Sequence, residues 1–480
     1  MLNTATPKER VEIFAAVRDK FELIATACIF LAVLALDLNA ALRGGGQGQD
    51  FYAHRRLTAQ VAADPLTWFS QARRRVDPPL YYFVSAAVLH LAGPDHWLVA
   101  LSVVNVLFNV SALLVFYLIS RLLLQSGLLR ICVLCFGGFL PAFVIPSVVI
   151  ATDALCQLLC LLMVYFVALA VLRKISLRSG LIGCIAVTVF GILCKFISVA
   201  LILAFLTTLV LALLSKQLRL RPAILGATWF LAATIPLQLF LLLQSPEGVA
   251  ISFAGTQASR QLRLKKLQLR SVLFFRSGDL QLLDVPAHWP MTQNPKTHSP
   301  SFWNFNRYSY PALLCLGTFT DVQNLFQSKT GLDREPKEPY KGGALVGKRS
   351  KLNQKLMKIS MRIGVPIFIC ILFSLPIFCL HSLIRLFRQG SARDFIWLSA
   401  FLFGAAWLCF MVCLIPLTLG AYIGGYYLTR LVVPSLMIFS LLFFAGLDRF
   451  ALFRQRYVAS ALLCLVIAQS LLHFAFLWMR

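Results

Sequence analysis

The sequence predicts an all-α polytopic membrane protein with about 11 transmembrane helices. Of its 480 residues, 59% are hydrophobic, and the mean hydropathy is +0.78, whereas soluble domains are roughly 45–50% apolar. Many apolar stretches exceed the ~18 residues that mark a spanning helix. A membrane β-barrel would show short segments of alternating apolar and polar residues, and the sequence lacks this alternation.

The chain begins with a charged, weakly amphipathic stretch, residues 1–20, which we expect to form a surface helix on the cytoplasmic side. The apolar stretch 21–42 follows as the first spanning helix. It is too long for a secretory signal and lacks a clear small-residue cleavage site, which indicates a retained membrane anchor.

A polar stretch, Arg43–Tyr82, comes next, and we predict that residues 43–96 form an active-site loop with juxtamembrane helices. A helix is expected over 51–63, and the motif DPPLYY at 77–82 should return the chain to the membrane. The apolar stretch 80–91 is too short to cross ~30 Å of hydrocarbon at 1.5 Å per residue. We therefore expect it to lie in the interface.

The distribution of Lys and Arg sets the predicted topology, because cytoplasmic connections collect these residues. With 80–91 in the interface, the spans are 21–42, 97–120, 131–149, 154–172, 180–194, 197–214, 223–243, 365–384, 395–418, 427–447 and 457–477. One set of connections then carries Arg121, Arg130, Arg173, Lys174, Arg178, Lys216, Arg219, Arg221, Arg385, Arg388, Arg393, Arg449, Arg454 and Arg456. This pattern predicts a cytoplasmic N-terminus, an outer C-terminus and an active-site loop on the outer face.

Four regions follow from this topology: 1–20 cytoplasmic, 21–243 a membrane module, 244–362 an outer-face segment, and 363–480 the C-terminal membrane helices. The outer segment is basic, but long loops cross the membrane regardless of charge. Within it we expect amphipathic helices at 260–276 and 310–327, an irregular centre at 285–310 and a flexible linker at 329–358. Its aromatic residues are either interfacial anchors or sugar-stacking groups; they are Trp289, Trp303 and Tyr308.

Several function classes are excluded at this stage. The net charge of +26 would suggest nucleic acid in a soluble protein, but the basic cytoplasmic connections explain about half of it, and we expect no nucleic-acid partner. All but Cys315 of the 13 cysteines lie in apolar segments, where Cys behaves as a small hydrophobe. Neither a P-loop nor a dinucleotide fingerprint is present. No metal-ligand set is apparent, and no cofactor is expected.

Asp50 and His54 are the first candidates for chemistry. Asp50 is either the N-cap of the helix 51–63 or a general base that deprotonates an acceptor hydroxyl or amine. His54 follows one helical turn later, and positions i and i+4 share a helix face. The two side chains could therefore act together.

The arginine run Arg73, Arg74 and Arg75 precedes the DPPLYY motif. These residues either contact lipid headgroups or clamp a phosphate or diphosphate, because guanidinium groups match phosphate oxygens bidentately.

Three further ionisable residues fall at predicted outer helix ends, where charges are expensive and often functional. Asp153 opens a span and is either a helix cap or a site residue. Lys195 interrupts two apolar runs and either snorkels to the interface or contacts phosphate. Arg430 begins a span on the outer side, against the charge rule, which favours a function.

Together these residues resemble the GT-C superfamily of polytopic glycosyltransferases, which includes protein O-mannosyltransferases and aminoarabinose lipid A transferases. The resemblance rests on motifs in order: the Asp in the first outer loop, PPLYY, the TDA helix start, the Lys between two helices, and YYLTRLVVP. It covers most of residues 21–240 and 420–447. Two departures are Phe51, where many relatives have Glu, and the acidic Asp77 before the two prolines.

The resemblance implies inverting transfer of a sugar from a polyprenyl-phosphate donor to a lipid, glycan or protein acceptor on the outer or lumenal face of the membrane. Asp50 matches the catalytic Asp of the family. The remaining matched or neighbouring residues are expected to bind substrate or phosphate: His54, Arg73, Arg74, Arg75, Asp77, Tyr82, Asp153, Lys195 and Arg430. A bacterial inner membrane is the favoured location.

Other classes of function remain open at the level of the sequence. A secondary transporter would usually show internal repeats and charges at the membrane midplane, whereas here no repeat is found and the charges gather at one face. A lipid-binding or assembly subunit without chemistry is another alternative. A further one is a different polyprenyl-phosphate enzyme, such as a polymerase or ligase.

Overall fold

A computed structural model describes residues 7–42, 51–66, 68, 78–148, 151–195, 198–244, 280, 314–315, 318–319, 351–418, 425–450 and 456–478. Throughout these ranges the regular structure is helical, with no strand. The fold class predicted from the sequence is therefore confirmed as an all-α polytopic membrane protein.

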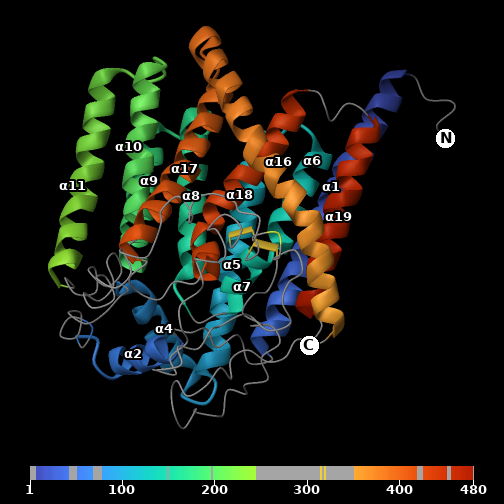
Figure 1. Ribbon diagram of the computed structural model, residues 1–480. Coiled ribbons are helices and arrows are strands. Elements are labelled where there is room, and N and C mark those ends of the chain that lie inside the picture. Colours follow the sequence, from blue (N-terminus) through green and yellow to red (C-terminus); the bar gives the residue numbers. More distant parts are fainter. Residues whose placement is uncertain are drawn as a thin grey trace.

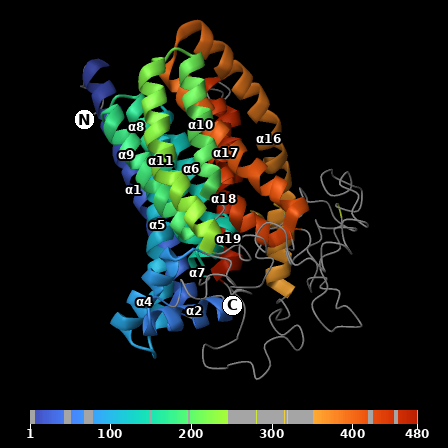
Figure 2. The ribbon, with the colours of Figure 1, turned by 90° about the vertical axis from the view of Figure 1, so that its left-hand side faces the viewer.

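Most of the helices form one bundle, in which they run alongside one another (Figures 1 and 2). The elements are α1 (Pro7–Leu42), α2 (Phe51–Ala63), α4 (Leu80–Ala92), α5 (Trp97–Leu123), α6 (Gly127–Phe139), α7 (Pro141–Val148), α8 (Asp153–Val171), α9 (Leu177–Cys194), α10 (Val199–Leu214), α11 (Leu220–Gln244), α16 (Lys351–Gln389), α17 (Ala392–Thr418), α18 (Gly425–Arg449) and α19 (Arg456–Trp478). Closely packed neighbours include α5 with α8, α8 with α9, and α17 with both α10 and α18.

Nine helices in the described part of the chain are long and apolar enough to cross a membrane. The eleven predicted spans require two more crossings, one by the bent pair α6–α7 and one by the shorter apolar helix α10. The two chain ends lie at opposite ends of the bundle (Figures 1 and 2), which agrees with an odd number of crossings. The count of eleven and the orientation remain predictions.

Helices α2 and α4 lie at the end of the bundle away from the N-terminus (Figure 1). The predicted helix 51–63 coincides with α2, and α2 packs against α4. Helix α4 has only 13 residues and is followed by Gly93 as its C-cap, whose φ of 75° favours glycine. This placement agrees with an interfacial rather than a spanning α4.

The connections predicted to be cytoplasmic meet at the opposite end of the bundle. The backbone N–H of Gln125 donates to Asp448 at 3.2 Å, and the side-chain amide of Gln217 donates to the carbonyl of Gly390 at 2.8 Å. Arg449 pairs with Asp394 there. Contacts between residues far apart in the sequence therefore hold the basic connections together at one end of the bundle.

An ion pair joins α1 to α6 near the same end. Arg130 reaches Glu22 with two parallel hydrogen bonds, Nε to Oε1 at 2.6 Å and Nη2 to Oε2 at 2.5 Å, and Tyr117 also donates to this carboxylate. Both charged side chains are largely buried, with 17% and 9% exposed. A paired guanidinium and carboxylate avoid the cost of an isolated buried charge.

Three sequence-based boundaries were wrong. The expected surface helix at the N-terminus and the first span form one continuous helix, α1, because no helix breaker separates them. The flexible linker was predicted to reach residue 358, but helix α16 already begins at Lys351. The span 131–149 is broken between α6 and α7 by a bend of 56°, since Pro141 lacks the N–H that would continue the helix ladder.

Candidate functional site

Asp153 and Lys195 form an ion pair at the start of α8 and the end of α9. Asp153 is the first residue of α8, and the preceding Thr152 makes no side-chain cap hydrogen bond. The Asp153 side chain is 2% exposed and that of Lys195 is 16% exposed. The structure therefore brings together two of the residues that the sequence singled out, and it favours pairing over snorkelling for Lys195.

Lys195 can reach Asp153 because the chain leaves helical geometry at this position. Its backbone is extended, with φ −156° and ψ 131°, directly after α9 ends at Cys194. Its N–H still donates to Gly191, at 2.8 Å, and its carbonyl accepts from Ser198, at 2.9 Å. The prediction that Lys195 separates two helices is confirmed.

Tyr81 from α4 lies next to this ion pair. Its side chain is fully buried, and the Asn105 amide of α5 donates to its hydroxyl oxygen at 3.2 Å. Burial raises the pKa of the Tyr81 phenol well above its ordinary range, and the nearby Asp153 carboxylate acts in the same direction. Tyr81 is therefore a neutral hydroxyl beside a charged pair.

His54 and Tyr82 connect the two helices at the end of the bundle. The His54 Nδ1 atom lies 2.9 Å from the Tyr82 hydroxyl, and the two rings stack with centroids 5.7 Å apart. His54 also meets the edge of Tyr81, with centroids 6.2 Å apart. The predicted site residues His54 and Tyr82 are thus in direct contact, and Tyr81 links them to Asp153.

Sequence reasoning missed several buried polar residues around the pair. Cys156 lies 3.7 Å from the Ser198 hydroxyl, and the Cys194 thiol donates to the carbonyl of Thr152 at 3.6 Å. Gln157, one turn after Asp153, is 2% exposed, and neither its amide oxygen nor its nitrogen has a hydrogen-bond partner among the described residues. Gln157 could have been found from the sequence, because a polar residue inside an apolar span is costly and often functional.

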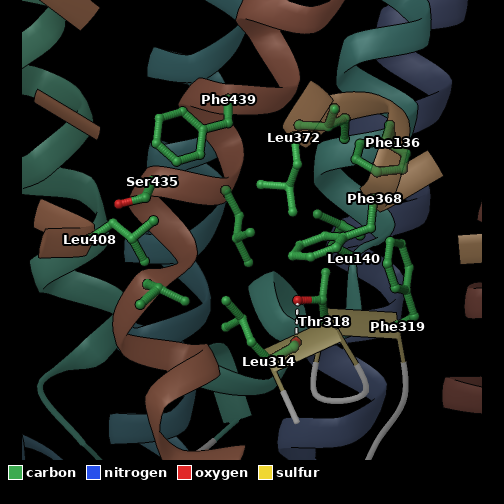
Figure 3. A pocket seen from close by; sticks show the side chains of 13 residues that line it. Phe136, Leu140, Leu314, Thr318, Phe319, Phe368, Leu372, Leu408, Ser435 and Phe439 are labelled. Atoms are coloured by element: carbon green, nitrogen blue, oxygen red, sulfur yellow. Dashed lines mark hydrogen bonds between the residues drawn. The ribbon is translucent and has the colours of Figure 1, made fainter. Parts of the chain in front are cut away.

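An apolar pocket lies in the bundle, where α6, α16, α17 and α18 meet Leu314, Thr318 and Phe319 (Figure 3). Its cavity volume is about 30 Å³. Its two hydroxyl groups are turned to the backbone: Thr318 donates to Leu314 at 2.7 Å and Ser435 donates to Gly404 at 2.8 Å. The lining therefore offers hydrocarbon and aromatic surface and suits an apolar ligand.

The pocket reaches the first turns of α18. Val432, which lines the pocket, is two residues after Arg430. Helix α18 also packs against α7 and α8. The same helix therefore connects the pocket to the segment that begins at Asp153.

Other predicted site residues lie outside the described residues. They are Asp50, Arg73, Arg74, Arg75 and Asp77, together with the aromatic residues Trp289, Trp303 and Tyr308. Arg430 lies on α18, but its side chain is not described. The described residues contain no group of three or more His, Cys, Asp or Glu side chains placed to hold a metal ion.

No protein-family model matches the chain, and no curated protein matches its sequence. Solved structures with a similar fold include the oligosaccharyltransferase of Archaeoglobus fulgidus in its apo form, with 12% identity and a TM-score of 0.49 over 95% of this chain and 56% of that one. The same archaeon's oligosaccharyltransferase AglB, in complex with an inhibitory peptide and a dolichol-phosphate, has 11% identity and a TM-score of 0.47, covering 95% of this chain and 55% of that one.

ArnT from Cupriavidus metallidurans bound to undecaprenyl phosphate has 13% identity and a TM-score of 0.35, covering 90% of this chain and 78% of that one. The chain spans little more than half the length of the archaeal enzyme.

Proposed function

We propose that the protein is a GT-C type membrane glycosyltransferase that moves a sugar from a polyprenyl-phosphate donor to an acceptor, with inversion at the anomeric carbon. The reaction would take place at the end of the bundle where α2 and α4 lie, on the outer face of a membrane that we take to be a bacterial inner membrane. The acceptor would be a lipid, a glycan or a protein.

The observation that carries this proposal is the meeting of five separate segments at that end. His54 on α2, the two tyrosines of α4, Asn105 on α5, Asp153 on α8 and Lys195 after α9 form a chain of contacts. Charged groups held at the ends of membrane helices are expensive and point to a function.

The apolar pocket and Arg430 supply the features that a polyprenyl-phosphate donor needs. We infer that the isoprenoid tail packs along the apolar side chains that line the pocket, because both hydroxyl groups among them donate to the backbone. The phosphate would then lie toward Arg430 and Lys195, with Arg74 and Arg75 closing over it from the loop. Arginine forms bidentate contacts with phosphate oxygens, and lysine acts as a compact charge.

In this mechanism Asp50 is the general base. The donor sugar would present its anomeric carbon to the loop, and Asp50 would accept the proton of the acceptor as the acceptor attacks. The glycosidic C–O bond to phosphate breaks at the same time, and the positive side chains stabilise the charge that develops on the leaving phosphate. The Asp153–Lys195 pair would keep the lysine ammonium at a fixed distance from that phosphate.

The test is a transfer assay with purified protein in nanodiscs. Radiolabelled polyprenyl-phosphate hexoses and pentoses would be offered with a membrane-lipid extract as acceptor, and release of label from the donor would be measured. We expect wild type to release label and Asp50→Asn to lose at least ~10²-fold in rate, as general base catalysis contributes about 10²–10⁴-fold. Asp64→Asn, the same charge change at the exposed end of α2, is the matched control.

Near-normal transfer by Asp50→Asn would overturn the assignment of the base. Binding of donor without turnover would favour a lipid-binding or assembly subunit. Uptake of sugar or ions into vesicles, with no label released, would favour a transporter.

A further inference from the structure

Two turns at the end of the bundle away from α2 and α4 carry exposed basic side chains. One turn joins α8 to α9, and the other joins α10 to α11 (Figure 1). We call these exposed residues the basic turn surface: Arg173, Lys174, Arg178, Lys216, Arg219 and Arg221. No ion pair in the described part of the chain includes any of them. The sequence between Asp153 and Glu247 contains no acidic residue, so neighbouring positions offer no counter-charge.

The two turns have the same backbone geometry. Arg173 has a φ of 56° and Lys216 a φ of 58°, and each follows the C-cap of its helix. The N–H of Arg173 donates to Ala170 at 3.1 Å and that of Lys174 to Leu169 at 2.9 Å, and equivalent bonds end α10. This pair of bonds is the Schellman motif, in which the residue with positive φ is usually glycine or asparagine.

Elsewhere the chain places glycine where φ is positive. Besides Arg173 and Lys216, the described residues with positive φ are Gly93 and Gly390. Gly390 follows α16 at the same end of the bundle as the two basic turns. A side chain at positive φ is strained, so Arg173 and Lys216 carry a cost that glycine avoids. Strained positions of this kind concentrate at functional sites.

The general excess of Lys and Arg in cytoplasmic connections explains the sign of this surface but not the chosen positions. A basic residue a few positions away would satisfy that rule without strain. Arg178 and Arg221 are the second residues of α9 and α11. The start of a helix disfavours a cation and favours an anion. A bound anion would therefore compensate both the side-chain charges and the helix starts.

The starts of α9 and α11 lie side by side, which joins the two turns into one surface. A β-carbon added to Gly226 would lie 3.9 Å from Leu181, and both residues are within the first two turns of their helices. The second turn is also fixed to the rest of the bundle, because Gln217 donates to the Gly390 carbonyl at 2.8 Å. The basic side chains are therefore presented from an ordered backbone.

We propose that the basic turn surface binds the phosphate headgroup of an anionic phospholipid in the leaflet at this end of the bundle. Leucines that are each more than half exposed stand in the same two turns: Leu177, Leu214 and Leu220. Basic side chains next to exposed leucines match a phospholipid, whose acyl chains adjoin its phosphate, better than a free phosphate ion. Guanidinium groups bind phosphate bidentately, and ammonium groups add compact charges. The proposal is independent of the transferase reaction.

Native mass spectrometry of the wild-type protein tests the lipid preference. The protein would be released from nanodiscs that contain equal amounts of phosphatidylglycerol and phosphatidylcholine with the same acyl chains. We expect phosphatidylglycerol to stay bound in preference. The double variant Arg173→Gly/Lys216→Gly should retain it at least ~10-fold more weakly, because each basic residue at a membrane surface adds several-fold to the affinity for anionic lipid. The matched control is Arg388→Gln/Arg393→Gln, which removes two exposed arginines beside Gly390 and should retain the lipid as wild type does.

Thermal unfolding separates lipid binding from the architecture of the turns. In phosphatidylcholine nanodiscs the glycine variant should unfold at the wild-type temperature or above it, because glycine relieves the positive φ. Phosphatidylglycerol should raise the unfolding temperature of wild type and of the control, but not that of the glycine variant. Equal retention of both lipids by wild type would overturn the proposal, as would equal losses in the glycine variant and the control. The same rise with soluble glycerol phosphate would also overturn it, because the surface would then take a free phosphate ester.

Discussion

Asp153 and Lys195 are 42 positions apart and form an ion pair where two membrane helices of one hairpin end. The buried partner is the carboxylate, while the lysine is the more exposed of the two. This asymmetry means that loss of the lysine leaves a buried charge, and loss of the carboxylate leaves a cation close to the surface.

Lys195→Met should therefore destabilise the protein more than Asp153→Asn does. Removing one partner of a buried pair costs about 3–5 kcal/mol, and removing both together costs less than the sum. The measurement is thermal unfolding of the two single variants and the double variant in nanodiscs. Arg130→Met at the other end of the bundle is the matched control, which should lower stability through Glu22 but leave transfer unchanged. Equal stability of Lys195→Met and wild type would refute this account.

His54 and Tyr82 should show coupled effects. Tyr82→Phe removes the hydroxyl at 2.9 Å from His54 and leaves a buried polar ring, with an expected cost of about 1–3 kcal/mol. In a double-mutant cycle with His54→Ala, the coupling energy should be about 0.5–3 kcal/mol, because contacting residues are not additive. Additive unfolding free energies would mean that the contact contributes nothing of its own.

Gly364→Ala should disturb the wall of the apolar pocket. A Cβ atom at this position would come 2.5 Å from the Phe319 ring, and overpacking of this kind costs about 1–3 kcal/mol. Gly226→Ala is the control, because its nearest heavy atom would be 3.9 Å away. Both thermal stability and retention of a polyprenyl phosphate in nanodiscs should fall for Gly364→Ala alone. Equal behaviour of the two variants would contradict the described packing of Phe319.

The predicted topology can be checked with two engineered cysteines in a cysteine-free background. Asp95 lies in the exposed turn after α4, and Gln389 lies at the exposed end of α16. Each would be replaced by cysteine in a separate variant. A membrane-impermeant maleimide should label Asp95→Cys in intact spheroplasts and Gln389→Cys only after permeabilisation. The reverse labelling would place the candidate site on the cytoplasmic face and exclude the outer-face reaction.

The sequence was a good guide wherever a local rule applied. Helix α2 has the expected bounds, and α8 begins at the Asp153 that was predicted to open a span. Lys195 was recognisable as a helix break because a charge interrupts an apolar run at a high energetic cost. These features depend only on neighbouring residues.

The pairing of distant residues was beyond local rules. Asp153 and Lys195 were each selected as candidates, yet nothing in their spacing indicates that they meet across 42 positions. Asn105 contacts Tyr81 from inside an apolar span, and an uncharged side chain there gives no local indication of its partner. The bend at Pro141 was also readable from the missing N–H of proline.

That bend has a consequence for how the protein assembles in the membrane. The bend leaves α6 as a short half-helix, and α19 packs against it. Helix α19 also bonds to α6 through Ser470 and the carbonyl of Cys135 at 3.3 Å. The two bonded residues are 335 positions apart in the chain, so α6 enters the bilayer well before α19, its partner in this contact, has been made.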